Sequence, residues 1–148
     1  MAYRIIVPHD YGPEADHALE WAAALIQSAG GSVVLLHVIL VPAPSIPKLP
    51  MIPALRPTED PSVSLGQLRA TAERHGVAAE VDVFETNDAG PGIVKRAKAL
   101  AGDLIVIGAT TPGRGGLSRA ILGSVIDHVV WNAASPVVVI RTAKQRAP

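Results

Sequence analysis

Five short hydrophobic runs, most of them rich in β-branched residues, are spread along the chain. Runs of this length indicate strands, and the continuous ones indicate strands that are buried on both faces of a sheet. The third run, AEVDVF, instead alternates apolar and acidic residues, which is typical of an edge strand with one wet face. The predicted strands are residues 3–8, 32–40, 79–84, 104–107 and 137–141.

Amphipathic stretches with apolar residues at helical spacing separate these runs. Pro13 suits the first position of a helix, and the pair Gly30-Gly31 suits its end. Ser124 opens the last helical stretch and stands three residues before Asp127, which fits a capping box. The predicted helices are residues 13–29, 65–75, 91–101 and 123–135.

Strands that alternate with helices in this way predict a single α/β domain over residues 1–148. Its core is a doubly wound, five-stranded parallel sheet with helices on both faces and right-handed crossovers. Ligands of such Rossmann-like folds bind at the carboxyl ends of the strands, where the strand order reverses. Asp10, just past the first strand, and Gly108, just past the fourth, are both expected there.

Composition disfavours several other classes of protein. The 148 residues suffice for one domain with a real core. The 13 Lys and Arg balance 13 Asp and Glu, which argues against a nucleic-acid-binding or membrane-surface protein, and no apolar run approaches a membrane span. The lack of cysteine excludes disulfides and thiolate sites. The N-terminus enters a strand without signal-peptide features, so we expect a cytoplasmic protein.

Between residues 41 and 62 the composition shifts toward proline. The density of proline there leaves no room for a helix or a central strand. We expect an exposed, semi-rigid loop with polyproline-like pieces. A plain variable loop is the simplest interpretation, and a lid, an oligomer contact or a docking site for a proline-binding module are the alternatives.

Residues 104–125, LIVIGATTPGRGGLSRAILGSV, hold the strongest candidate for chemistry. Gly108 ends the predicted strand, a loop with Gly113 and the cation Arg114 follows, and Gly123-Ser124 opens the predicted helix. Glycines let the backbone approach an anion and a helix N-terminus adds positive potential, so this order suits a phosphate. A loop that is glycine-rich only because it turns tightly is the alternative, and a pure helix cap explains Ser124 equally well.

Other familiar motifs are missing or incomplete. The five histidines show no metal-binding spacing, and no GxSxG elbow occurs. Gly108 and Gly113 have P-loop spacing, but Arg114-Gly115 replaces Lys-Ser/Thr, which argues against a P-loop NTPase. Asp10 is suited either to accept hydrogen bonds from a ligand or to cap a turn. His37, in an apolar strand, is expected at the edge of the core.

Over nearly its full length the chain resembles single-domain universal stress proteins. The resemblance is carried by RIIVPHD at the N-terminus, HALEWA in the first helix, then LLHVI, DLIVIG and SPVVVIR. The most specific piece is GRGGLSRAILGS: Gly113, nine residues and Gly123-Ser124 match the second half of the family's nucleotide signature, Gly-2x-Gly-9x-Gly-Ser/Thr. The resemblance implies the fold expected above, in its adenine nucleotide α-hydrolase-like form.

The resemblance also implies a nucleotide site. Family members that bind ATP hold its phosphates and ribose with the signature glycines and the Ser or Thr. They contact adenine with the Asp after the first strand and the Val of the LHV segment. The sequence departs from this pattern at Thr110, where the first signature glycine is expected, at bulky Tyr11, which is expected to narrow the pocket, and at residues 87–92. The expected ligand contacts are Pro8, His9, Asp10, Val38, Gly108, Gly113, Arg114, Gly123, Ser124 and Val125.

The leading interpretation is an ATP-binding stress-response or regulatory protein, a binding module with Mg²⁺ as an optional companion of ATP and at most slow ATP hydrolysis. The alternative is a dimeric interaction scaffold of the same fold that does not bind ATP. A true enzyme is disfavoured because no general base or nucleophile is visible near the glycine loop. We also expect a homodimer through the strand Val137–Arg141, since an apolar run at a sheet edge is a hazard unless it is paired.

Overall fold

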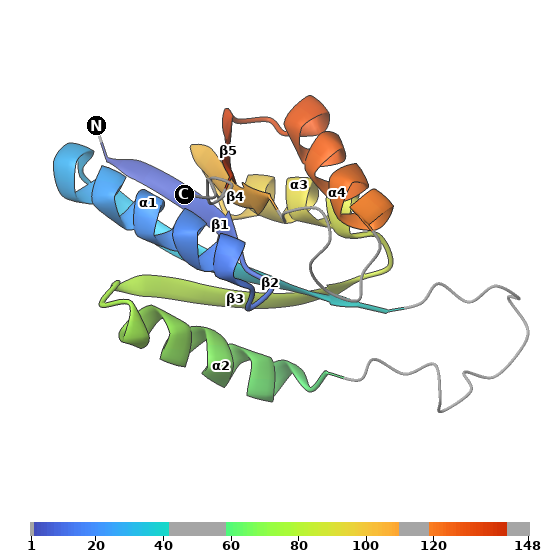
Figure 1. The fold of residues 1–148 in the computed structure, drawn as a ribbon, viewed down its shortest axis with the longest axis horizontal. Coiled ribbons are helices and arrows are strands. Elements are labelled where there is room, and N and C mark those ends of the chain that lie inside the picture. The colour runs from blue at the N-terminus through green and yellow to red at the C-terminus, as the bar shows by residue number, and fades with distance from the viewer. Residues whose placement is uncertain (1, 42–58, 110–118, 142–148) are drawn as a thin grey trace, which may run out of the picture.

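The protein is an α/β domain in which strands and helices alternate strictly, as the sequence predicts (Figure 1). The computed structural model describes residues 2–41, 59–109 and 119–141. Most of the proline-rich loop expected at 41–62 lies outside these residues. The elements are β1 (Tyr3–Pro8), α1 (Pro13–Ala29), β2 (Gly31–Leu40), α2 (Pro61–Arg74), β3 (Ala79–Thr86), α3 (Ala89–Ala99), β4 (Leu104–Ala109), α4 (Arg119–Asn132) and β5 (Val137–Arg141).

The five strands form one parallel sheet in the order β3-β2-β1-β4-β5. The chain winds outward from the central β1 to β3, then returns to the other side of β1 to form β4 and β5. The strand order therefore reverses between β1 and β4, which makes their carboxyl ends the switch point of the fold. The acidic alternation of β3 correctly predicts an edge strand.

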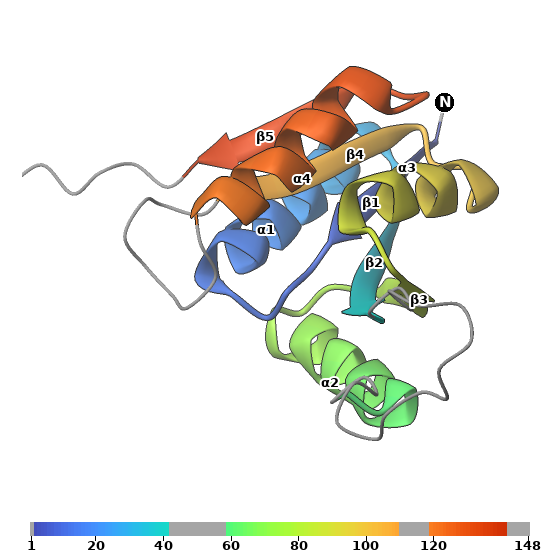
Figure 2. The ribbon, with the colours of Figure 1, turned by 90° about the vertical axis from the view of Figure 1, so that its right-hand side faces the viewer.

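Two hydrophobic layers cover the two faces of the sheet (Figures 1 and 2). Side chains alternate between faces along each strand, so Ile5 and Val7 pack with α1 and α2, whereas Ile6 packs with α3 and α4. The same alternation separates Val33 from Val34 on β2. Because both faces are covered, the strands other than β3 are largely continuous apolar runs.

The sequence pattern suggested that Gly108 ends the fourth strand. In the structure Gly108 lies within that strand. Its partner in the sheet is Ile140, and β4 continues to Ala109. A Cβ on Gly108 would overlap the carbonyl oxygen of Glu14 and lie 2.9 Å from the backbone nitrogen of Ala15. The glycine is thus needed for the first turn of α1 to pack directly on β4.

The last helix begins earlier than predicted. It starts at Arg119, so Gly123 and Ser124 lie in its second turn and the predicted capping box from Ser124 to Asp127 is wrong. The predicted start rested on the apolar pattern that begins at Val125. In the structure, residues 119–122 (RAIL) also belong to this helix. Only the first turn of a helix has free N–H groups, so Ser124 does not stand at the positive end that the sequence suggested.

The second helix also begins earlier than predicted, inside the proline-rich segment. Pro61 is its first residue, where a missing N–H costs nothing because no helical partner exists there. The Asp60 side chain accepts a hydrogen bond from the Ser62 N–H at 2.9 Å and caps the helix. Proline at this one position therefore starts a helix instead of excluding it.

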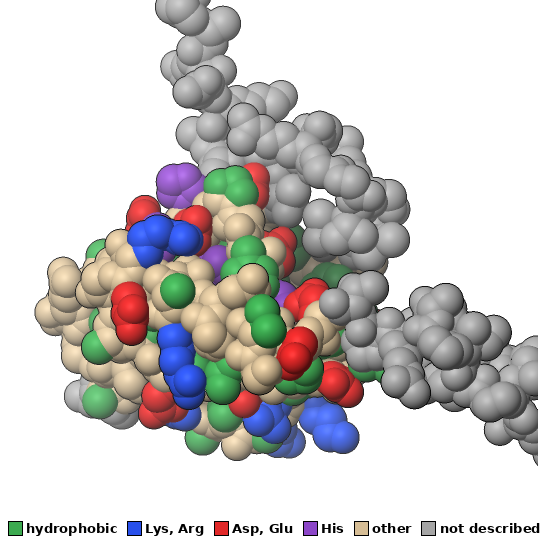
Figure 3. Space-filling model, turned by 90° about the horizontal axis from the view of Figure 1, so that it is seen from below, with side chains coloured by type: hydrophobic (Ala, Val, Ile, Leu, Met, Phe, Trp, Pro, Cys, Tyr) green, Lys and Arg blue, Asp and Glu red, His purple; other side chains and the backbone are tan. Residues whose placement is uncertain are grey.

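Charged side chains are mixed on the surface. On the face seen in Figure 3, basic and acidic side chains are interspersed and the described part forms no continuous patch of one sign. Among the residues that the structure describes, no helix is long and apolar enough to cross a membrane.

The packing at Gly108 gives a direct test of the fold. Gly108→Ala should lower the free energy of unfolding by about 1–3 kcal/mol, because the added methyl group forces α1 away from β4. The matched control is Gly66→Ala in α2, where a Cβ meets nothing within 4 Å and the helix gains about 0.5–1 kcal/mol. Urea denaturation measures both. Equal stability of the two variants would contradict this account of Gly108.

Candidate functional site

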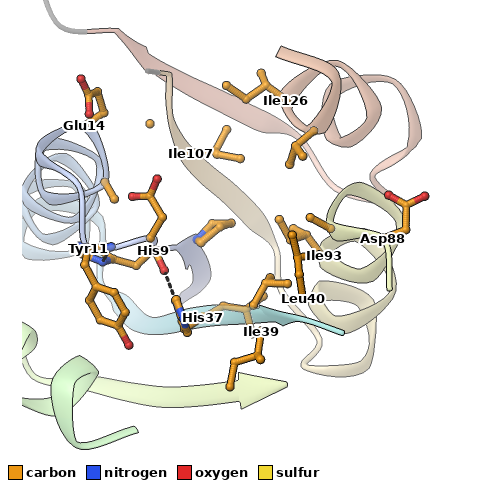
Figure 4. Close-up of a pocket in the computed structure, with 18 of the residues that line it drawn as sticks. His9, Tyr11, Glu14, His37, Ile39, Leu40, Asp88, Ile93, Ile107 and Ile126 are labelled. Carbon is orange, nitrogen blue, oxygen red and sulfur yellow. Dashed lines mark hydrogen bonds between the residues drawn. The ribbon is translucent and has the colours of Figure 1, made fainter. Parts of the chain in front are cut away.

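A pocket of about 580 Å³ opens at the carboxyl ends of β1, β2 and β4 (Figure 4). The first residues of α1 and α3 and the second turn of α4 complete its wall. Seven of the ten predicted ligand contacts line it: Pro8, His9, Asp10, Val38, Gly108, Ser124 and Val125. Parts of the chain that are distant in sequence thus meet where the fold places the switch point.

The other three predicted contacts are not among the described residues that line the pocket. Gly123 is exposed, and it is not among the residues that line the cavity. A Cβ at Gly123 would meet nothing within 4 Å in the part of the chain that the structure describes, so packing against that part does not explain this glycine. Gly113 and Arg114 lie outside the described residues.

One side of the pocket is apolar and the other is polar. Ile107 from β4 and Ile126 from α4 form one part of the apolar side, and Leu40 and Ile93 form another (Figure 4). His9 and its neighbours at the end of β1 lie across from them. A flat ligand with an apolar face and hydrogen-bonding edges suits such a cavity.

His9 is buried at the end of β1 and is held as the neutral ring. Its Nδ1 accepts a hydrogen bond from the Tyr11 N–H at 3.0 Å, so this nitrogen carries no proton. Its Nε2 lies 2.9 Å from a carboxylate oxygen of Asp16, to which it donates. Burial lowers the pKa of His9, and this effect outweighs the opposing attraction of Asp16.

Tyr11 links the end of β1 to the start of α2. Its hydroxyl donates to the Ser64 carbonyl oxygen at 3.0 Å, and its ring lies tilted against His37 with centroids 4.5 Å apart. Its φ of 67° is unfavourable for a residue with a side chain. The hydrogen bonds of its N–H and hydroxyl offset that strain. Burial raises the pKa of the Tyr11 hydroxyl.

His37 is buried as the sequence suggests, but it also lines the pocket. Its Nδ1 donates to the His9 carbonyl oxygen at 2.7 Å, drawn as the dashed line in Figure 4. Its Nε2 lies 2.6 Å from a carboxylate oxygen of Glu59, which also accepts from the Ser64 hydroxyl at 3.2 Å. The end of β2 is therefore tied to the residues that lead into α2.

The charged residues that line the described part of the pocket are all acidic. They are Asp10, Glu14, Glu59 and Asp88, and neither Lys nor Arg is among the described lining residues. Within those residues, no group of three or more His, Asp or Glu is placed to hold a metal ion.

Sequence reasoning missed several lining residues for an identifiable reason. Glu14 was read only as a favourable charge in the first turn of a helix, and Glu59 and Asp88 lie in loops before helices. No local motif marks them. The signal that was available is topological, because residues at or just before the start of a helix that follows a strand lie at the same edge as the strand ends.

The fold and this pocket define an α/β protein with a cavity at the switch point of its parallel sheet, and comparison with known proteins identifies its family. The family model described as Universal stress protein family matches residues 1–141. Universal stress protein MJ0531 of Methanocaldococcus jannaschii is 30% identical over 146 residues, which cover 96% of this chain and 84% of that protein. The chain belongs to the universal stress protein family.

Solved structures agree with this fold. A universal stress protein family protein of Arabidopsis thaliana, solved with AMP bound, is 20% identical with a TM-score of 0.64, covering 99% of this chain and 95% of that one. The universal stress protein of Archaeoglobus fulgidus in complex with dAMP is also 20% identical with a TM-score of 0.64, covering 95% of this chain and 98% of that one. At this identity the match establishes the fold.

The buried His9 predicts how stability depends on pH. Its pKa is lower in the folded chain than the usual value near 6.5, so its contribution to stability is complete above about pH 6.5 and falls as the pH drops further. His9→Gln should therefore flatten the fall in unfolding free energy between pH 7.5 and 5, measured by urea denaturation. The exposed His17→Gln is the control and should keep the wild-type slope. Identical slopes for wild type and His9→Gln would contradict the assignment.

Proposed function

We propose that this chain is an adenine-nucleotide-binding module with a regulatory role in the stress response of the cytoplasm. The observation that carries the proposal is the shared pocket, in which residues from β1, β2, β4 and α4 that the family resemblance assigns to the nucleotide line one cavity. ATP is among the ligands of this proposal, with at most slow hydrolysis.

The pocket fits the base and sugar of such a ligand in size and chemistry. A volume of about 580 Å³ lies within the range of small-molecule sites. Val38 and the isoleucines offer apolar surface to a flat base, and Asp10 offers carboxylate oxygens to its amine or to sugar hydroxyls. The AMP and dAMP complexes of the two structural relatives support an adenine nucleotide as the ligand.

Mg²⁺ accompanies ATP in this proposal as part of the ligand. Because the described residues supply no cluster of three metal ligands, the ion would be held mainly by phosphate oxygens and water. Sites of this kind, with one or two carboxylates at most, are usual for Mg²⁺.

The proposal is tested by thermal unfolding with and without ligand. An adenine nucleotide at about a hundred times its dissociation constant should stabilise the protein by about 2.7 kcal/mol. For a chain of this size the midpoint should rise by roughly 5–10 °C. Gly123→Val should abolish the shift if the ligand's phosphates approach the backbone there, whereas Ser124→Ala should only weaken it.

The Gly123 variant is informative because the fold has room for it. A Cβ at Gly123 meets nothing within 4 Å among the described residues, so the variant should unfold without ligand near the wild-type midpoint. If millimolar AMP or ATP with magnesium gives no shift in the wild type, and no nucleotide remains bound through native purification, the non-binding interaction scaffold becomes the better account.

The same proposal includes a homodimer through β5. This strand is at the sheet edge, where its outer N–H and C=O groups lack a neighbouring strand among the described residues. Its apolar side chains pack into both layers, Val138 on one face and Val139 on the other. Trp131, near the end of α4, is 83% exposed and Val130 is 43% exposed, so the helix that precedes this strand also carries exposed apolar surface. A second β5 would complete the sheet.

A proline tests this edge pairing without disturbing β4. The Ile105 N–H donates to the Pro136 carbonyl oxygen, and backbone groups alternate in direction along a strand, so the Val139 N–H points to the outer edge. Val139→Pro should convert the dimer to a monomer in light scattering at micromolar concentration. Val139→Thr keeps the N–H and should remain dimeric. A monomeric wild type would refute the pairing.

A further inference from the structure

Glu14 differs from the other carboxylates of the pocket because it is buried. Its side chain belongs to a residue only 7% exposed, whereas Asp10, Glu59 and Asp88 are exposed to solvent. Asp10 accepts a hydrogen bond from the Gly12 N–H at 2.9 Å, and Glu59 contacts His37 and Ser64. Within the described residues, the Glu14 carboxylate has no hydrogen bond or ion pair.

The fold fixes where this charge lies. The backbone of Glu14 packs on Gly108, so the residue is held at the end of β4, where the family resemblance expects phosphates (Figure 4). A Cβ added to Gly12 would lie 3.6 Å from a Glu14 carboxylate oxygen and 2.9 Å from an Asp10 carboxylate oxygen. Two carboxylates therefore face the same end of the pocket.

Glu14 lines the cavity, and a negative charge that has no partner among the described residues acts on whatever ligand displaces water beside it. Like charges repel strongly where water is excluded, and each additional phosphate on a ligand adds to the repulsion. A neutral nucleoside escapes this effect, and a divalent cation bound to the phosphates cancels much of it.

We propose that Glu14 is a specificity-determining residue of the pocket, which selects adenosine and AMP over ATP that lacks a divalent cation. The inference rests on the proposed function, because it concerns the ligands of the same site. It names the substrate class as an adenine nucleoside or monophosphate, or a polyphosphate whose charge a metal ion neutralises.

Calorimetric titration with adenosine, AMP and ATP tests this, first in EDTA and then with 5 mM Mg²⁺. In EDTA the wild type should bind ATP roughly tenfold more weakly than AMP, and Mg²⁺ should narrow that gap. Glu14→Gln should remove most of the gap in EDTA by strengthening ATP binding far more than adenosine binding. Glu14→Asp keeps the charge and should keep the gap.

Glu73→Gln is the matched control, since it removes the same charge from an exposed position near the far end of α2 and should behave as the wild type. An equal ratio of AMP to ATP affinity in wild type and Glu14→Gln overturns the role of Glu14, while the proposed function stands. If none of the three ligands binds either protein, the proposed function itself falls, and this inference with it.

Discussion

The close contact between the first turn of α1 and the end of β4 is the constraint on which the pocket depends. Only glycine at position 108 lets the two backbones meet, because a side chain there would overlap the Glu14 carbonyl oxygen. This contact sets the height of α1 over the sheet. It thereby positions Glu14 beside the strand end, in the wall of the cavity.

A second set of contacts holds the polar side of the pocket. Tyr11, His9 and His37 form a linked group in which ring nitrogens, a backbone N–H and a backbone carbonyl are all used. The group joins the ends of β1 and β2 and reaches α2 through the Tyr11 hydroxyl. The polar side of the pocket is therefore rigid by hydrogen bonding, whereas its apolar side is set by packing.

Sequence patterns predicted the architecture well because the spacing of apolar residues along a strand or helix indicates which of its faces are buried. The continuous apolar runs of β1 and β2 and the alternation in β3 gave the layers and one edge of the sheet correctly. The start of α4 was missed because glycine and serine suit a helix entry, yet here they lie inside the helix despite their low helix propensity. The roles of Gly108 and Glu14 could not be predicted, since they depend on a contact between elements that are far apart in sequence.

The central claim is that the cavity at the strand ends binds an adenine ligand between its apolar and polar sides. Isoleucine methyl NMR during titration with AMP tests it most directly. The methyl signals of Ile93, Ile107 and Ile126, which line the cavity, should shift, and those of Ile5 in the other core layer should not. Saturating AMP that leaves the three cavity signals in place, or that shifts only residues away from the strand ends, would contradict the account.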